Sequence, residues 1–378
     1  MNRFNHLYKL IITVLFIAFL GTLILLSILM PTKAFSQSEN RMLQQFPKFT
    51  FERLTNGRFA SEWEKYVTDQ IALRDFWVGV KAKADMSLGK RDNNDVYLGD
   101  GYLLQKFDRY DEKDLKTKVE AINAFSKDNH DVKTYFMLVP NAVKVLEQKL
   151  PPFASPQDQL KFIDKVKKGL DKNIHFVEVC DPLLAHKDEY IFYRTDHHWT
   201  TDGAYYGYEA FAKASGFSPH GKDYFNITEV TDTFYGSLYS KSGFRNVKPD
   251  SIRLYLPKTN EGINLLLLDK NEKHDTIYKM DNLHKKDKYT VFFDGNHPLM
   301  KITTNSEQNK KLLIIKDSFA NSFIPFLTGH YEEIYIVDLR YYNESISELV
   351  ESNGIKEVLI LYSVNTFSED NTINRIAW

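Results

Sequence analysis

The chain has 378 residues, of which 43% are hydrophobic, 14% aromatic and 26% charged. This composition is that of a folded protein and excludes a disordered or fibrous one. The formal net charge of −1 argues against an extended nucleic-acid-binding surface. A single cysteine, Cys180, excludes a disulfide framework, and its setting after Phe176 predicts a buried strand residue without a catalytic role.

The first predicted element is a membrane span at residues 10–30. Leu10–Met30 contains no charged residue, and a helix of this length would be about 30 Å long, enough to cross a bilayer. The run is too long for the apolar part of a cleaved signal peptide, so we expect an uncleaved anchor. Arg3 and Lys9 precede it, which places the tail 1–9 in the cytoplasm and the rest of the chain outside, although Lys33 weakens this asymmetry.

Residues 31–95 are expected to form a helical, membrane-proximal segment. Phe59, Trp63 and Tyr66 recur at helical spacing and give one apolar stripe. We interpret the polar run Ser38–Arg41 and the charged pair formed by Asp69 and Arg74 as surface or interdomain contacts.

The main domain is predicted to occupy residues 96–378. Its first half alternates helices and strands, which favours a parallel sheet with right-handed crossovers. The expected elements are a helix at 112–129, a strand at 132–139, a helix at 157–171 and a strand at 175–179. Ligands gather at the carboxyl ends of such strands, so Asn141, which follows the first strand, is a candidate substrate-binding residue.

A dense run of ionisable and aromatic side chains comes next. Asp196, His197, His198 and Trp199 precede a helix that we expect to start near Thr201 and to stop at Gly216. The following stretch, residues 218–306, has short β-prone pieces at 252–256 and 290–293 between turn residues, and we interpret it as a β-rich insertion.

The last part of the chain returns to alternating strands and helices. Strands are predicted at residues 311–315, 333–337 and 357–361, with a helix at 319–328. Ser318 follows the first of these strands, where a hydroxyl would be exposed at the sheet edge. A simple helix N-cap explains a serine there equally well. Asn365 follows the third strand and could donate to an oxyanion or close a turn.

The chemistry that best unites these residues is nucleophilic catalysis. A nucleophilic serine needs a base, and that base needs an acid that orients it. Ser318 could be the nucleophile, His198 the base and Asp196 the orienting acid. Spacing alone leaves open whether His197 is the base instead. Metal ligation by Asp196 and the two histidines is disfavoured because no further ligand cluster completes a shell, and we expect neither a metal nor a cofactor.

The block Asp196–His198 followed by Trp199, together with Lys316–Ser322 around the serine, resembles the DHHW protein family of Gram-positive bacteria. That family is similar to the alginate O-acetyltransferase group of SGNH-hydrolase-like enzymes. The resemblance implies a flavodoxin-like α/β fold of SGNH-hydrolase type, circularly permuted because the histidine block precedes the serine block. This sequence departs from the hydrolase pattern at three places where that pattern has a glycine. Lys316 replaces the first, Tyr362 or Ser363 stands at the second, and Arg340 lies in the region of the third.

These observations predict a membrane-anchored, extracytoplasmic O-acetyltransferase that acts on a cell-envelope polysaccharide. Ser318 would carry the acetyl group, with the Ser318 amide and Asn365 as oxyanion donors. Arg340 would bind substrate or pair with Asp338, and Trp199 is assigned to substrate binding. The resemblance implies that a membrane-bound O-acyltransferase supplies acetyl groups. A carbohydrate esterase with the same triad and a non-catalytic wall-assembly protein are the alternatives, and the insertion is a candidate for acceptor specificity.

Overall fold

The computed structural model describes residues 2–36, 41–108 and 110–378. The chain separates into two compact units. Unit 1 comprises residues 1–90 with 243–245, and unit 2 comprises residues 91–242 and 246–378. Of the polar run expected to make surface contacts, Ser38 and its two successors lie outside the described residues.

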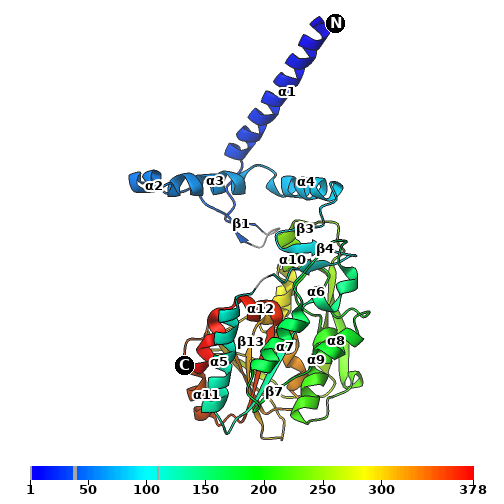
Figure 1. Ribbon diagram of the computed structural model, residues 1–378, viewed down its shortest axis with the longest axis vertical. Coiled ribbons are helices and arrows are strands. Elements are labelled where there is room, and N and C mark those ends of the chain that lie inside the picture. The colour runs from blue at the N-terminus through cyan, green and yellow to red at the C-terminus, as the bar shows by residue number, and fades with distance from the viewer. Residues whose placement is uncertain (1, 37–40, 109) are drawn as a thin grey trace. The chain divides into compact units, whose positions relative to one another are not determined.

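Unit 1 begins with the long helix α1 (Asn2–Leu29), whose segment Asn5–Leu29 is long and apolar enough to cross a membrane (Figure 1). The hydroxyls of Thr13, Thr22 and Ser27 each donate to the backbone carbonyl four residues earlier. These bonds satisfy the three hydroxyl donors within the helix, as an apolar environment requires.

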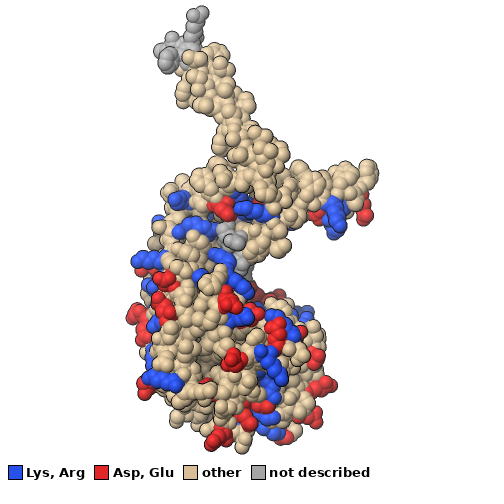
Figure 2. Space-filling model, turned by 180° about the vertical axis from the view of Figure 1, so that it is seen from behind, with Lys and Arg blue, Asp and Glu red and all other residues tan. Residues whose placement is uncertain are grey.

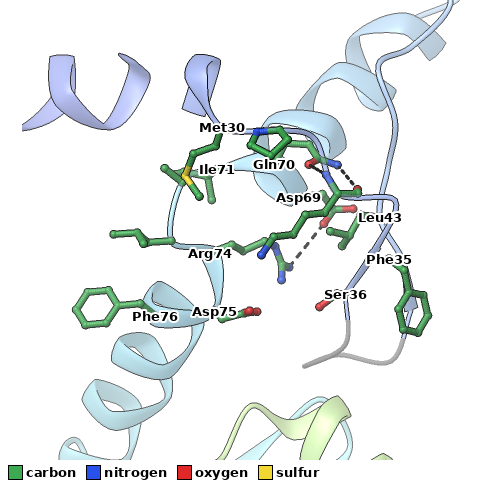
Figure 3. A pocket seen from close by; sticks show the side chains of 14 residues that line it. Met30, Phe35, Ser36, Leu43, Asp69, Gln70, Ile71, Arg74, Asp75 and Phe76 are labelled. Carbon is green, nitrogen blue, oxygen red and sulfur yellow. Dashed lines mark hydrogen bonds and ion pairs between the residues drawn. The ribbon is translucent and has the colours of Figure 1, made fainter. Parts of the chain in front are cut away.

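The rest of unit 1 consists of a two-stranded ribbon and three helices. The bounds are β1 (Phe35–Ser36), β2 (Arg41–Met42), α2 (Phe51–Thr55), α3 (Arg58–Gln70) and α4 (Arg74–Ser87). Asp69 is buried at the end of α3, where its carboxylate accepts from Arg41 and from the amide of Gln44 (2.8 Å). It also lies 3.6 Å from Arg74 (Figure 3). The Arg41 hydrogen bond is the main cause that holds the pKa of Asp69 below its ordinary value. The expected pair with Arg74 is therefore present, but Asp69 is buried and these partners belong to unit 1, so the pair is neither the surface nor the interdomain contact that we expected.

Unit 2 is built on an eight-stranded sheet with the order β11-β10-β12-β14-β13-β15-β6-β7. Five neighbouring strands are parallel, and their bounds are β6 (Lys133–Val139), β7 (Ile174–Phe176), β13 (Lys311–Lys316), β14 (Glu333–Val337) and β15 (Glu357–Ser363). β13 and its two neighbours are buried runs of Ile, Leu and Val, as strands covered on both faces require. The predicted parallel sheet is thus present, within a mixed α/β fold.

The stretch predicted to be a separate insertion is partly built into this sheet. β12 (Leu299–Thr303) pairs antiparallel with β14, and β10 (Asn264–Leu267) and β11 (Glu272–His274) extend the same edge. β8 (Phe225–Phe234) and β9 (Asp250–Pro257) form their own antiparallel pair. Residues 288–291 form the 3-10 turn η4 where a β-prone piece was predicted.

The longer helices of unit 2 are α5 (Glu112–Asp128), α7 (Gln159–Gly169), α9 (Thr201–Ser215) and α11 (Ile346–Asn353). Asp111, Asp158 and Thr200 cap the first three of these helices, and Gly216 ends α9 in a left-handed conformation, as predicted. Short helices and strands complete the unit: α6 (Ala142–Val145), α8 (Cys180–Ala185), α10 (Ser237–Ser242), α12 (Val364–Glu369), β3 (Asp92–Asn93), β4 (Val96–Leu98) and β5 (Leu103–Gln105).

Two further local predictions are wrong. Cys180 starts helix α8 and is not part of a strand, and burial raises the pKa of its thiol to about 12. The helix predicted at 319–328 is a pair of 3-10 turns, η5 (Ser318–Ser322) and η6 (Ile324–Leu327). Pro325 lacks the N–H that a continuous α-helix would use, which accounts for the interruption.

In the face of unit 2 that Figure 2 shows, side chains of both charges are interspersed.

Candidate active site

The acid-and-histidine loop lies just before α9 and is held by its tryptophan. Trp199 is fully buried, and its Nε1 donates to the carbonyl of Phe319 at 2.8 Å. Gly207 of α9 faces the same indole, since a Cβ there would come within 2.9 Å of two of its ring carbons. Trp199 therefore ties this loop to the serine turn and is not exposed to substrate, which corrects its predicted role.

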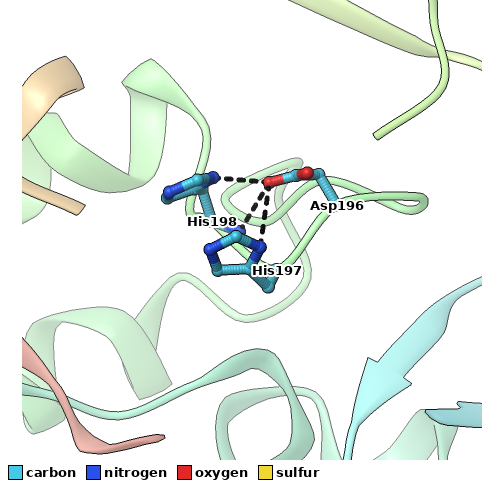
Figure 4. A group of neighbouring side chains, drawn as sticks. All are labelled: Asp196, His197 and His198. Carbon is cyan, nitrogen blue, oxygen red and sulfur yellow. Dashed lines mark hydrogen bonds and ion pairs between the residues drawn. The ribbon is translucent and has the colours of Figure 1, made fainter. Parts of the chain in front are cut away.

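Asp196, His198 and Ser318 form one hydrogen-bonded chain, although 120 residues separate the histidine from the serine. His198 Nδ1 lies 2.5 Å from Asp196 Oδ1, and His198 Nε2 lies 2.7 Å from Ser318 Oγ (Figure 4 shows the acid and the histidines). Asp196 Oδ1 also accepts from the His198 amide at 3.1 Å. The ring thus has one nitrogen on an acid and the other on a hydroxyl, the arrangement of a base that activates a nucleophile.

The Asp196 carboxylate is enclosed on its other side by the start of α10. Its Oδ2 accepts from the Ser237 amide at 2.7 Å, and a Cβ on Gly236 would lie within 2.4 Å of that oxygen. Burial opposes the charged carboxylate, but the two neighbouring imidazoles and these hydrogen bonds outweigh it, so the pKa of Asp196 lies below its ordinary value. The acid is therefore held ionised, as an orienting carboxylate must be.

His197 has different partners from His198. Its Nδ1 lies 2.7 Å from Ser237 Oγ and 3.6 Å from Asp196 Oδ1. Burial, followed by the charge of His198, lowers the pKa of His197 to about 4, so the ring is neutral at neutral pH. In this geometry His198, and not His197, reaches the serine.

Ligand atoms of Asp196, His197 and His198 lie within 4.8 Å of one another, close enough for a metal ion. Both ring nitrogens of His198 are already engaged, one by Asp196 and one by Ser318. A bound ion would have to displace one of these partners, so the donor set fits a proton relay better than a metal centre.

Ser318 lies at the carboxyl end of β13, in a turn that Asp317 holds. Asp317 Oδ1 accepts from the Phe319 amide at 2.9 Å, and its Oδ2 accepts from the amide and the hydroxyl of Ser363 at the end of β15. Within the described residues the Ser318 amide donates no hydrogen bond. The turn therefore presents both the hydroxyl and the amide of Ser318.

Two fully buried charges, Lys316 and Asp338, lie close to this turn. Lys316 is fully buried, donates to Asn296 Oδ1 at 2.6 Å and lies 3.6 Å from Asp338. Burial lowers its pKa to about 8, against the attraction of Asp338. Arg340 donates to both oxygens of Asp338 at 2.8 and 2.6 Å. Of the two roles predicted for Arg340, the structure shows the pairing with Asp338.

Tyr289 is a member of the site that sequence reasoning missed. Its ring stacks on His198 with centroids 3.9 Å apart and planes 11° apart, and its hydroxyl donates to the Ser318 carbonyl at 3.0 Å. Tyr289 lies in η4, within the stretch interpreted as an insertion. No spacing links it to the other site residues, and an aromatic residue in an aromatic-rich chain carries no signal of its own.

Asn365 and Asn141 lie side by side in the core. The Asn365 amide nitrogen donates to the Lys106 carbonyl at 2.8 Å, and the Asn365 backbone donates to Asn141 Oδ1 at 3.1 Å. Gln159 donates to the Asn141 and Asn365 side-chain oxygens at 3.5 and 3.3 Å. One of the two N–H groups of the Asn365 amide is thus engaged by the Lys106 carbonyl, and its role as an oxyanion donor stays a prediction. Asn141 is buried, and its Nδ2 has no hydrogen-bond partner among the described residues.

The chain matches one protein family and is similar to several solved structures. A family model described as DHHW protein matches residues 80–337. A DHHW family protein from Eubacterium siraeum DSM 15702 has a similar structure, with a TM-score of 0.61, 24% identity, and coverage of 74% of this chain and 94% of its own. Bacillus cereus PatB1 matches with a TM-score of 0.63 and 23% identity, over 73% of this chain and 98% of its own.

A more distant neighbour is the O-acetyltransferase domain of Pseudomonas putida AlgJ, with a TM-score of 0.48 and 14% identity over 73% of this chain and 93% of its own. It is too distant to add to the structural argument. No curated protein sequence matches this chain.

Proposed function

The chain belongs to the DHHW protein family, and from that premise we propose that it is a serine-dependent O-acetyltransferase acting on hydroxyls of a cell-envelope polysaccharide. The single observation that carries the proposal is the position of His198, whose ring bridges Asp196 and Ser318 through contacts of 2.5 and 2.7 Å.

The proposed reaction has two halves. His198 Nε2 takes the proton of Ser318 Oγ as that oxygen attacks the acetyl carbonyl, and it then gives the proton to the departing donor group. The acetyl group now rests on Ser318 as an ester. In the second half His198 takes the proton of a sugar hydroxyl, whose oxygen attacks the ester, and returns the proton to Ser318 Oγ. Asp196 holds the tautomer and stabilises the imidazolium in both halves.

The oxyanion formed in each half needs a hydrogen-bond donor. The Ser318 amide fits this role because it adjoins the attacking oxygen and has no acceptor within the described residues. The amide nitrogen of Asn365 already donates one of its two N–H groups to the Lys106 carbonyl, so we place the main oxyanion donor at the Ser318 amide. Tyr289 is a positioning residue that holds the His198 ring by stacking and the Ser318 carbonyl by a hydrogen bond.

The fold proposed for unit 2 is a circularly permuted, flavodoxin-like SGNH domain. The parallel strands lie in the order β14-β13-β15-β6-β7. Numbered from β13 and continued from β15 to β6, this order becomes 2-1-3-4-5, the flavodoxin-like order. Permutation explains why the histidine block, which follows the serine in the hydrolase pattern, here precedes it.

We further propose that α1 anchors the chain in the cell membrane with unit 2 on the outer side. The apolar length of α1 and the placement of Arg3 and Lys9 before the apolar run support this topology. A membrane-bound O-acyltransferase is the proposed source of acetyl groups. Labelling of Cys residues introduced before and after α1 in intact cells, with a reagent that cannot cross the membrane, would test the topology. Labelling only on the side of residue 9 would contradict it.

The experiment that tests the function offers the full-length protein a chromogenic acetyl ester together with a wall oligosaccharide. Acetylated oligosaccharide, detected by mass spectrometry and lost in Ser318→Ala, is the expected result. Release of acetate without acetylated sugar would instead establish the carbohydrate esterase. If Ser318→Ala, His198→Ala and Asp196→Ala all leave ester turnover and envelope acetylation unchanged, the protein has a non-catalytic role.

A further inference from the structure

Unit 1 carries a cluster of aromatic side chains that touch one another yet remain exposed. Phe46 and Trp63 have ring centroids 5.5 Å apart, and Phe49 and Phe59 have centroids 5.3 Å apart. Phe46, Phe49 and Trp63 are nevertheless 63%, 62% and 42% exposed. Together with Phe51 and Val67, which are also exposed, these residues form what we call the aromatic surface. An exposed group of this size marks an interaction site.

Part of the aromatic surface lies on one face of α3. Phe59, Trp63 and Val67 follow one another at four-residue spacing, whereas Ser61 and Lys65 lie on the opposite face and are exposed. The next helix repeats the pattern, since Leu73, Phe76 and Val80 of the α4 region are exposed at 56%, 58% and 41% (Figure 3 shows Phe76). Two successive helices thus present apolar side chains to their surroundings.

The same segment contacts α1, the proposed membrane span. The Ala72 amide donates to Ser27 Oγ in the last turns of α1 at 2.9 Å, and Trp77 meets Phe19 with ring centroids 6.0 Å apart. Within unit 1, helices α3 and α4 run crosswise to α1 (Figure 1). Apolar faces that adjoin a span and lie across it are placed where the acyl chains of a bilayer meet its headgroups.

The charge of this segment also favours a lipid bilayer as its partner. Residues 31–90 contain ten Lys and Arg against seven Asp and Glu, whereas residues 91–378 contain thirty-seven against forty-three. The basic excess outside the span is therefore confined to the segment that holds the aromatic surface. Anionic lipid headgroups attract such a segment, and Trp and Phe rings are favoured at the level of the headgroups.

We propose that α2, α3 and α4 lie in the headgroup layer of an anionic bilayer, with the aromatic surface turned toward the acyl chains. This inference rests on the proposed anchoring of α1. The membrane attachment then has two parts, a span that fixes the chain in the bilayer and interfacial helices that hold residues 46–80 against its surface. A second membrane protein covering the same side chains is the competing occupant, and the test separates the two.

The test uses the full-length chain in nanodiscs of phosphatidylcholine and phosphatidylglycerol, with no other membrane protein present. In a Cys180→Ser background, single nitroxide labels are placed through Val67→Cys on the aromatic surface, Ser61→Cys on the opposite face and Leu15→Cys in α1. Collision rates with oxygen, which concentrates in lipid, and with a water-soluble nickel complex report the surroundings of each label. All three side chains are exposed, so the labels do not disturb a packed core.

We expect oxygen collisions to dominate at positions 67 and 15 and nickel collisions at 61. A label at 67 that remains in water while that at 15 is in lipid overturns the inference and leaves the anchor intact. The inference also fails if the label at 67 leaves water only after a second membrane protein is added. Water around both 15 and 67 overturns the anchor as well. Ester turnover, measured on the same preparations, reports on the proposed enzyme separately.

Discussion

Replacing Asp196 by asparagine tests the proposed base most directly, because it preserves the size of the side chain and removes its charge. Asp196 Oδ1 accepts from both the amide and Nδ1 of His198, and Oδ2 accepts from the Ser237 amide. An asparagine oxygen can serve one of these two sides only. If the oxygen faces His198, the tautomer is kept, but the negative charge that stabilises the imidazolium is lost. If the oxygen faces Ser237, the NH2 group faces His198 Nδ1 and forces the ring proton onto Nε2, the nitrogen that should accept from Ser318.

This wrong tautomer costs serine triads on the order of 10⁴-fold in kcat. Asp196→Asn should therefore reduce kcat/KM for a chromogenic acetyl ester by about 10³ to 10⁴-fold, equivalent to about 4 to 5 kcal/mol of transition-state stabilisation. Circular dichroism and thermal unfolding would verify that the variant is folded. Combining Asp196→Asn with Ser318→Ala should add almost nothing to the loss from Ser318→Ala alone. A folded variant that retains more than about a tenth of the activity would refute the proposed relay.

Three further predictions follow from individual contacts. Tyr289→Phe keeps the ring but loses the hydrogen bond to the Ser318 carbonyl, so kcat for the ester should fall about fivefold with KM nearly unchanged. Tyr289→Leu also loses the stack on His198, so it should lower kcat further and shift the pH profile of kcat. Equal losses in both variants would contradict the positioning role. Asn365→Ala leaves the part-buried Lys106 carbonyl and the buried Gln159 amide without this partner, so the free energy of unfolding in urea titrations should fall by about 1 to 3 kcal/mol. Ester turnover should change by less than about threefold, and a loss above about a hundredfold would show that Asn365 is an oxyanion donor. Burial, followed by the charges of its neighbours, lowers the pKa of His330 from 6.5 to about 4. As the pH falls, the unfolded chain therefore binds this proton before the folded protein does, and up to about 3 kcal/mol of folding stability is lost between about pH 6.5 and 4. His330→Gln should flatten this pH dependence, and an unchanged slope would show that other groups cause it.

Local pattern predicted much of the sheet and its helices. The run at 333–337 matches β14, and the helix predicted after the histidine block begins at Thr201 and ends before Gly216, because caps and glycine act over one turn of chain. The predictions failed where distant contacts decide. Residues 299–303 join the main sheet because the edge of β14 is open to them, and Cys180 starts a helix instead of ending a strand. Propensity cannot detect the first effect, since strand pairing depends on which edge the rest of the fold leaves free.

The sequence by itself determined which residues could do chemistry and in what chain order. Asp196 lies two residues from His198, so a loop suffices to bring acid and ring together, and a serine after a buried strand is exposed by the geometry of the turn. Tertiary structure alone decided the rest. It distinguished His198 from His197 by which ring reaches Ser318, placed Tyr289 over the base, and engaged the Asn365 amide with a backbone carbonyl far along the chain. Each of these depends on the direction of a side chain across a packed interface, and that direction is set by neighbours that lie tens to hundreds of residues away in the chain.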